Sequence, residues 1–205
     1  WRIDCFEGAK DLPAIVHCAA KLRVALKDKL LLFTFRTKAE GGKVALAHEE
    51  YLHFIRTVLA TDCADLIDIE FFTAGAELPA LIEEARTAGA AVVCSSHDFH
   101  KTPPRAELVS RMVAMQRAGA DLPKLAVMPQ SRTDVLELLA ATAEMADRHP
   151  ETPIITMSMG ALGAVSRLSG EALGSAMTFA NPGQASAPGQ VSLDVVNEVL
   201  DALHL

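Results

Sequence analysis

Short apolar runs alternate with longer amphipathic segments along the whole chain. The runs are rich in Val, Ile, Leu and Phe and are bounded by polar or turn-forming residues, which is typical of β-strands. We expect seven strands, at residues 1–6, 30–36, 65–72, 90–99, 124–129, 153–159 and 175–180. Several of these runs are apolar at consecutive positions, which favours parallel strands covered by helices over strands with one face in water.

The segments between the runs have the periodicity of helices. In residues 45–60, one helical stripe contains Leu46, Tyr51, Phe54, Ile55 and Leu59. The segments 77–90 and 131–149 follow the same pattern, and the second begins with two candidate N-caps, Ser131 and Thr133. The alternation therefore predicts seven βα units with right-handed crossovers.

Seven βα units suit an α/β fold of the (β/α)8 TIM-barrel type that lacks its first unit. A closed barrel of this type has eight strands, and the chain begins inside an expected strand at Trp1, without an initiator methionine. We therefore expect residues 1–205 to form a single, N-terminally truncated barrel domain. The alternative is an open doubly wound sheet, which neither a G-x-G-x-x-G loop nor a P-loop sequence supports.

Charge and cysteine usage narrow the classes of partner. The chain of 205 residues has a formal net charge of −7, which argues against nucleic acid or an anionic membrane as a partner. No apolar run reaches the roughly 18 residues of a membrane helix. The four cysteines show neither a C-x-x-C pair nor metal-ligand spacing, so we expect free thiols, no metal site and a cytoplasmic location.

Polar residues cluster where the expected strands end, which is where barrel enzymes carry their chemistry. His97 ends one strand, and strand alternation places it on the same side as Ser95, facing either the barrel mouth or the helix layer. It is either a structural hydrogen-bonding residue or a proton carrier. Glu40 is either a solvated loop carboxylate or a group that orients an imidazole. Three arginines lie near strand ends, Arg2, Arg36 and Arg167. Each is either a surface charge or a group that binds a carboxylate or hydroxyl.

Lys124 stands at the head of the apolar run 125–128. Its amine either reaches solvent at the bottom of the barrel or rises through the interior beside the small Ala126. A desolvated lysine has a lowered pKa, and its neutral amine attacks carbonyl groups. A lysine and a histidine in one barrel mouth would therefore indicate Schiff-base chemistry with proton transfer beside a carbonyl.

Six motifs in a fixed order resemble the type I 3-dehydroquinate dehydratase family. They are "EGG" after "FTFRTKA", "SSHDFHKTP" (95–103), "PKLAVMPQ" (123–130), "MSMG" (157–160), "SRLSGE" (166–171) and "ASAPGQ" (185–190). The resemblance runs from "WRID" at the start to the last helix. It implies a homodimeric barrel of the shikimate pathway that dehydrates 3-dehydroquinate to 3-dehydroshikimate without metal or organic cofactor.

The resemblance also implies roles for individual residues. Lys124 would form an imine with the substrate ketone, His97 would act as general acid and base, and Glu40 would orient His97. The substrate-binding residues would be Arg2, Arg36, Arg167, Ser186 and Gln190. In the family a glutamate precedes the tryptophan of the "WRID" segment, and that glutamate is not in these residues.

Two other functions compete with this interpretation. One is another Schiff-base barrel lyase, such as a class I aldolase, although the chain has no phosphate-binding signature. The other is a catalytically silent barrel left by truncation. Borohydride trapping of an imine separates the three possibilities.

Overall fold

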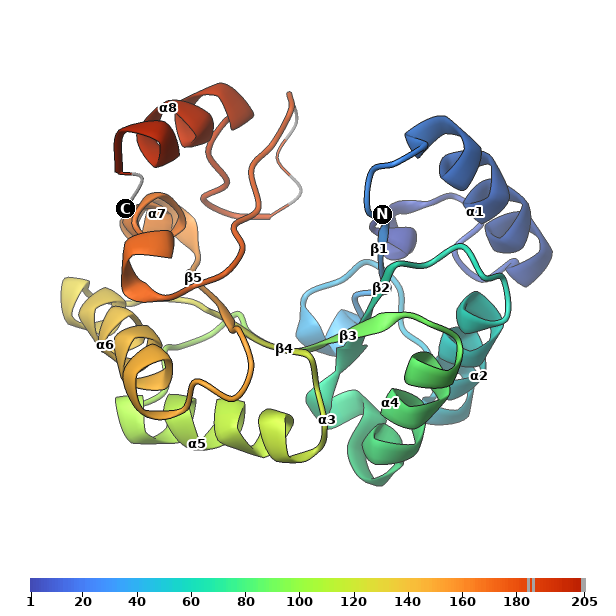
Figure 1. The fold of residues 1–205 in the computed structure, drawn as a ribbon, viewed down its shortest axis with the longest axis horizontal. Coiled ribbons are helices and arrows are strands. Elements are labelled where there is room, and N and C mark those ends of the chain that lie inside the picture. Colours follow the sequence, from blue (N-terminus) through green and yellow to red (C-terminus); the bar gives the residue numbers. More distant parts are fainter. Residues whose placement is uncertain (184, 186, 204–205) are drawn as a thin grey trace. The chain divides into compact units, whose positions relative to one another are not determined.

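The computed structural model describes residues 1–183, 185 and 187–203, which fold into two compact units. The first unit comprises Trp1–Ser96 and Ala118–Asp121, and the second comprises His97–Arg117 and Leu122–Leu205. Parallel strands and their following helices build both units, as Figure 1 shows. The structure therefore confirms the α/β class with parallel strands, whereas closure of the strands into a barrel stays a prediction.

The first unit is built on β1 (Leu32–Thr34), β2 (Leu66–Glu70) and the larger part of β3 (Ala91–Asp98). Leu32 lies opposite Leu66, and Leu66 lies opposite Ala91, so the three strands run in parallel register. Its helices are α1 (Leu12–Leu26), α2 (His48–Leu59), α3 (Phe71–Ala74) and α4 (Leu78–Thr87), with short 3-10 turns η1 (Ile3–Cys5), η2 (Lys38–Glu40) and η3 (Gly75–Glu77).

The second unit contains β4 (Leu122–Val127) and β5 (Ile155–Ser158), which pair in parallel with Lys124 opposite Ile155. Its helices are α5 (Arg105–Arg117), α6 (Arg132–Arg148), α7 (Gly160–Leu168) and α8 (Leu193–Leu203), with the 3-10 turn η4 (Glu171–Leu173). Buried apolar side chains from α5 and α6 pack with the strands, as expected for a layered core.

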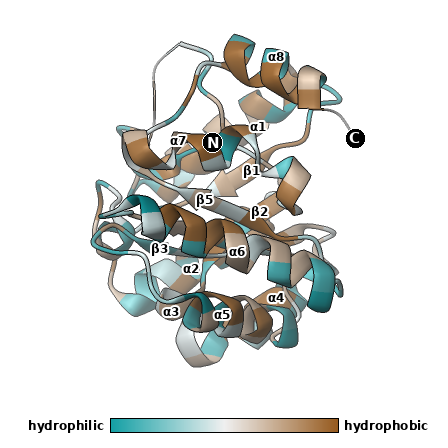
Figure 2. Ribbon diagram, turned by 90° about the vertical axis from the view of Figure 1, so that its left-hand side faces the viewer, coloured by the Kyte–Doolittle hydropathy of each residue, from teal (hydrophilic) through white to brown (hydrophobic). Residues whose placement is uncertain are grey.

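Two of the segments with helical periodicity, 45–60 and 131–149, are confirmed as helices. The stripe in 45–60 becomes α2, with Tyr51, Phe54 and Ile55 buried, although Leu46 precedes the helix. The segment 131–149 becomes α6, whose N-cap is Ser131, because the Ser131 hydroxyl accepts the backbone N–H of Asp134. In Figure 2 hydrophobic and hydrophilic stretches alternate along α6, as in an amphipathic helix.

Two of the expected strands are wrong. Residues 1–6 pair with β1 only at Arg2, opposite Thr34, and then turn into η1, where the Cys5 N–H donates to the Arg2 carbonyl. Residues 175–180 make only one bridge, between Ser175 and Ile154. The Ser175 hydroxyl, and not a main-chain carbonyl, accepts the N–H of Thr156, so the ladder is not continued there.

The remaining strands agree with their predicted positions and differ mainly in length. The strand expected at 30–36 is only Leu32–Thr34, and that expected at 65–72 ends at Glu70, where α3 begins. None of the helices in the described ranges combines the length and apolarity that crossing a membrane requires.

Candidate active site

The predicted site residues fall into two sets, one in each unit. Arg2, Arg36 and Glu40 belong to the first unit, and His97, Lys124, Arg167 and Gln190 belong to the second. Ser186, the remaining predicted substrate contact, lies outside the described residues.

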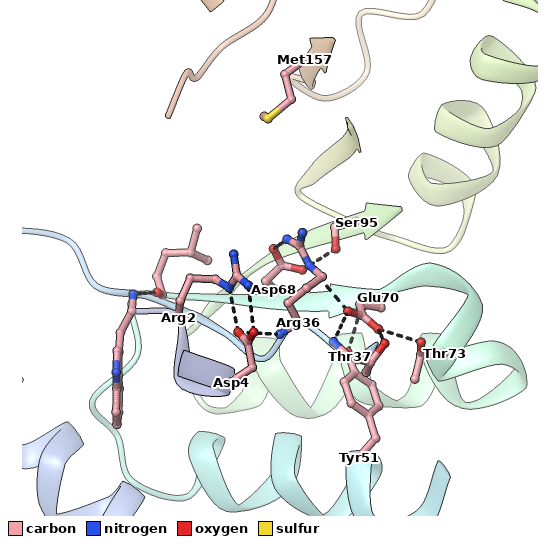
Figure 3. Close-up of polar contacts among 12 residues, drawn as sticks. Arg2, Asp4, Arg36, Thr37, Tyr51, Asp68, Glu70, Thr73, Ser95 and Met157 are labelled. Carbon is pink, nitrogen blue, oxygen red and sulfur yellow. Dashed lines mark hydrogen bonds and ion pairs between the residues drawn. The ribbon is translucent and has the colours of Figure 1, made fainter. Parts of the chain in front are cut away.

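In the first unit, Arg2 is held by a carboxylate two residues further along the chain. Its Nε and Nη2 donate to Asp4 Oδ1 and Oδ2 at 2.7 and 2.8 Å, a bidentate pair that Figure 3 shows. These hydrogen bonds raise the pKa of Arg2. Burial disfavours ionisation of Asp4, but the bonds from Arg2 and from backbone amides outweigh it, so the pKa of Asp4 lies below its usual value.

Arg36 follows β1 and lies buried between two carboxylates. Its Nη2 is 3.9 Å from Asp68 Oδ2 and its Nε is 3.7 Å from Glu70 Oε1, both ion pairs longer than a hydrogen bond. Among the described residues, nothing accepts a hydrogen bond from its buried Nε. Charge, and not hydrogen bonding of normal length, therefore holds this guanidinium within the part of the chain that the structure describes.

Glu40 is the last residue of η2 and is buried, which excludes the solvated loop carboxylate that the sequence left open. The following "GG" explains how the chain turns there. Gly41 has φ = 84°, and a Cβ on Gly42 would lie 1.9 Å from the Arg36 carbonyl oxygen. The glycines therefore let the chain fold back against Arg36.

In the second unit, Lys124 is buried, with 3% of its surface exposed. Its Nζ lies 4.7 Å from the centroid of the Phe179 ring. The sequence left open a lysine that reaches solvent at the bottom of the fold, and this burial excludes it.

The strand register defines the face on which Lys124 lies. Lys124 pairs with Ile155 and Ala126 pairs with Met157, whereas Leu125 pairs with Thr156. A hydrogen bond of 2.6 Å joins the Thr156 hydroxyl to Thr142 on α6. Because side chains alternate across a strand, Lys124 and Met157 project from the face of the sheet opposite α6.

Arg167, on α7, reaches the same group of side chains. Its Nη1 is 3.5 Å from both Met157 Sδ and the Phe179 carbonyl oxygen, and its Nη2 donates to the Pro188 carbonyl at 3.2 Å. Arg167 is only 2% exposed, and burial lowers its pKa. Within the described ranges its guanidinium has only neutral acceptors and its Nε has none, which leaves it suited to an incoming carboxylate.

The Gly/Pro/Ser-rich loop after residue 180 is tied to the start of α7. The Gly160 N–H donates to the Pro188 carbonyl, the same oxygen that Arg167 contacts. Gly189 has φ = 74°, and a Cβ there would lie 2.3 Å from the Gly160 carbonyl oxygen. Gln190 follows, and its own carbonyl accepts from the Asn181 side chain at 3.3 Å.

His97 is buried near the end of β3, and the turn that follows is held by Asp98. Asp98 Oδ1 accepts the backbone N–H groups of His100 and Lys101. Ser158, which also ends a strand, faces α7, because its backbone N–H donates to Ser166 and a Cβ on Gly163 would overlap its side chain.

Asp4, Met157 and Phe179 contact the predicted site residues and were not themselves identified from the sequence. Asp4 holds Arg2, Met157 contacts Arg167, and Phe179 contacts both Lys124 and Arg167. Only Asp4 carried a usable signal, as an acidic residue two positions after an arginine in an otherwise apolar segment.

The chain is similar to known proteins over its whole length. A family model described as type I 3-dehydroquinase matches residues 1–205. The 3-dehydroquinate dehydratase of Klebsiella pneumoniae strain 342 is 48% identical over 203 residues, which cover 99% of this chain and 81% of that protein. The 3-dehydroquinate dehydratase of Bacillus subtilis strain 168 is 48% identical over 204 residues, covering 100% of this chain and 80% of that protein.

Solved structures give the same result. A crystal structure of the type I 3-dehydroquinate dehydratase from Clostridium difficile, with covalently modified comenic acid, has a TM-score of 0.95 and 44% identity. That match covers 100% of this chain and 80% of the other chain. The 3-dehydroquinate dehydratase of Geobacillus kaustophilus HTA426 has a TM-score of 0.94 and 39% identity, covering 99% of this chain and 79% of the other.

Proposed function

We propose that this chain, a 3-dehydroquinate dehydratase of the type I 3-dehydroquinase family and therefore a carbon–oxygen lyase, acts through a lysine Schiff base. The substrate is 3-dehydroquinate and the product is 3-dehydroshikimate, an intermediate of aromatic amino-acid biosynthesis. The observation that carries the mechanism is the burial of Lys124 inside the fold, with 3% of its surface exposed, because a lysine there is held away from solvent and can serve as the nucleophile toward a bound ketone.

In this mechanism Lys124 Nζ attacks the substrate ketone, and loss of water gives an iminium ion. The iminium withdraws electrons from the neighbouring carbon, so that His97 can remove the C2 proton and leave an enamine. The enamine expels hydroxide, which takes a proton from His97 and leaves as water. A second water molecule then hydrolyses the product iminium and frees the lysine, for a net loss of one water.

The remaining residues would orient and bind. Glu40 would hold the imidazole of His97 in position, as carboxylates do beside other histidines. Arg167, together with Gln190 and Ser186, would bind the substrate carboxylate, and Arg2 and Arg36 would contact its hydroxyl groups. The buried, incompletely bonded guanidiniums of Arg167 and Arg36 support this assignment.

The experiment is reduction with borohydride in the presence of saturating 3-dehydroquinate. We expect a covalent adduct on the peptide that contains Lys124, no adduct in Lys124→Met, and an unchanged adduct in the matched control Lys21→Met, an exposed lysine on α1. His97→Ala should still form the adduct but lose nearly all turnover, because it keeps the nucleophile and lacks the base.

Two outcomes would contradict the proposal. Turnover without any adduct would exclude the imine, and neither turnover nor adduct at saturating ligand would indicate a silent fold. The homodimer and the cytoplasmic location that the resemblance implies stay predictions, and light scattering after size exclusion would test the first.

A further inference from the structure

The segment Arg36–Lys43 carries two of the proposed site residues, Arg36 and Glu40, and it has little regular structure of its own. Apart from the short η2, its backbone is held by the neighbouring Val44, which bridges to Thr37 and accepts the Lys38 N–H, and by side chains from elsewhere in the first unit. Asp4 accepts the backbone N–H groups of Arg36, at 3.4 Å, and Lys43, at 3.1 Å. Thr37, the second residue of the segment, is held by a different carboxylate.

That carboxylate is Glu70, the last residue of β2, which is 0% exposed. Its Oε1 accepts the backbone N–H of Thr37 at 2.8 Å, and its Oε2 accepts the Thr37 hydroxyl at 2.7 Å (Figure 3). Thr37 is the residue from which η2 starts, and its carbonyl in turn accepts the N–H groups of Glu40 and Gly42. A chain of hydrogen bonds therefore runs from Glu70 through Thr37 to Glu40.

Glu70 is itself fixed from two further sides. Thr73, on α3, donates its hydroxyl to Glu70 Oε2 at 2.7 Å, and the Glu70 backbone N–H donates to the Tyr51 hydroxyl at 2.8 Å. Both Glu70 oxygens thus have short hydrogen bonds, and Oε1 also faces Arg36 Nε. Burial raises the pKa of Glu70, and the bonds from Thr37 and Thr73 oppose that rise. A carboxylate whose acceptors are already used is placed to orient neighbours and not to react with a ligand.

We propose that Glu70 is a positioning residue for dehydration, which sets Arg36 and Glu40 through its bonds to Thr37. The proposal depends on the function proposed above, in which Arg36 contacts a substrate hydroxyl and Glu40 orients the base. Asp4 contributes to the same segment, but its hydrogen bonds to Arg2 tie it directly to another proposed binding residue, whereas Glu70 makes its hydrogen bonds within this segment to Thr37.

The test compares variants that remove different bonds to this one carboxylate. Glu70→Gln has the shape of the native side chain but replaces one acceptor oxygen by an NH2 group and removes the charge facing Arg36. Thr73→Val is the matched control, because it removes one hydrogen bond to Glu70 and leaves the Thr37 bonds in place. Thr37→Val removes only the hydroxyl bond and serves as a second variant should Glu70→Gln fail to fold.

We expect Glu70→Gln to lower kcat by about 10- to 100-fold and to raise KM several-fold, with the borohydride adduct at Lys124 retained. Thr37→Val should show a smaller loss of the same kind, and Thr73→Val should stay within about twofold of the parent. Melting temperatures measured alongside report any general loss of structure.

Kinetics of Glu70→Gln within twofold of the parent would overturn the proposal, as would equal losses in Glu70→Gln and Thr73→Val. If Glu70→Gln does not fold, parent-like kinetics of Thr37→Val would overturn it. Failure of the proposed function would be seen separately, because the parent itself would then form no adduct.

Discussion

At the scale of single residues, Arg167 carries a positive charge that its surroundings do not balance. In the described part of the chain it contacts a thioether and two carbonyl groups, and no carboxylate. Burying a guanidinium without a counter-charge costs free energy, and such a cost is common where a charged ligand supplies the missing partner. Removing this charge should therefore weaken substrate binding without lowering the free energy of unfolding.

Arg167→Met tests this directly. We expect KM for 3-dehydroquinate to rise about 100-fold, because the loss of a buried, charge-assisted contact is typically about 2–5 kcal/mol. The free energy of unfolding should be equal to that of the parent or about 1–2 kcal/mol higher, since an uncompensated buried charge is gone. Steady-state kinetics and urea unfolding measure the two effects.

The control for that variant is Arg132→Met on α6, an exposed arginine whose replacement should change neither quantity. Arg167→Lys keeps the charge and loses the planar fork, so its KM should lie between those of the parent and Arg167→Met. A marked loss of stability with unchanged KM in Arg167→Met would show that Arg167 is structural.

At the scale of elements, α6 illustrates how a helix boundary is fixed. The sequence offered Ser131 and Thr133 as caps, and the structure uses Ser131, whose hydroxyl accepts the Asp134 N–H at 3.2 Å. The Asp134 carboxylate returns the contact by accepting from the Ser131 hydroxyl at 2.9 Å and from the Gln130 N–H at 2.7 Å. These bonds lower the pKa of Asp134.

Ser131→Ala should destabilise the protein by about 1 kcal/mol, because the N-terminal amides of α6 lose an acceptor. For a chain of this size that corresponds to a fall in Tm of about 2–4 °C. Thr133→Ala is the matched variant and should cost nothing, since Thr133 lies inside the helix and alanine is the better helix former. Equal destabilisation by the two variants, measured by calorimetry, would contradict this assignment of the cap.

The elements that sequence reasoning located best are those whose pattern repeats locally. Ser131 and the apolar stripe of α2 could be predicted because capping and periodicity are properties of a few adjacent residues. The strands expected at 1–6 and 175–180 were wrong, because a strand also needs a continuous partner, which no local pattern reveals. There, side chains such as those of Asp4 and Ser175 take over backbone hydrogen bonding.

The same distinction applies to the candidate site. The motifs marked Lys124, Arg36 and Arg167, since charged residues within apolar runs are conspicuous in a sequence. Phe179 and Glu70 act through contacts with residues far away in the chain, so their neighbours became known only from the folded structure.

At the scale of the whole molecule, the net charge of −7 is unfavourable for an anionic substrate. Attraction must then come from short-range contacts with individual arginines. In the second unit the proposed contacts include Arg167, whose guanidinium donates to the Pro188 carbonyl. A ligand bound there should stabilise this unit, because binding to the native state alone opposes every opening that breaks its contacts.

Hydrogen exchange on the borohydride-reduced adduct can measure this. We expect slower exchange around Arg167 and Pro188 of the second unit, relative to the unmodified chain. Lys124→Met treated with the same reagents is the control and should show no slowing once free ligand is removed. Unchanged exchange around Arg167 and Pro188 in the adduct would mean that Arg167 does not bind the substrate held at Lys124. In that case the buried guanidinium of Arg167 would serve the stability of the second unit alone.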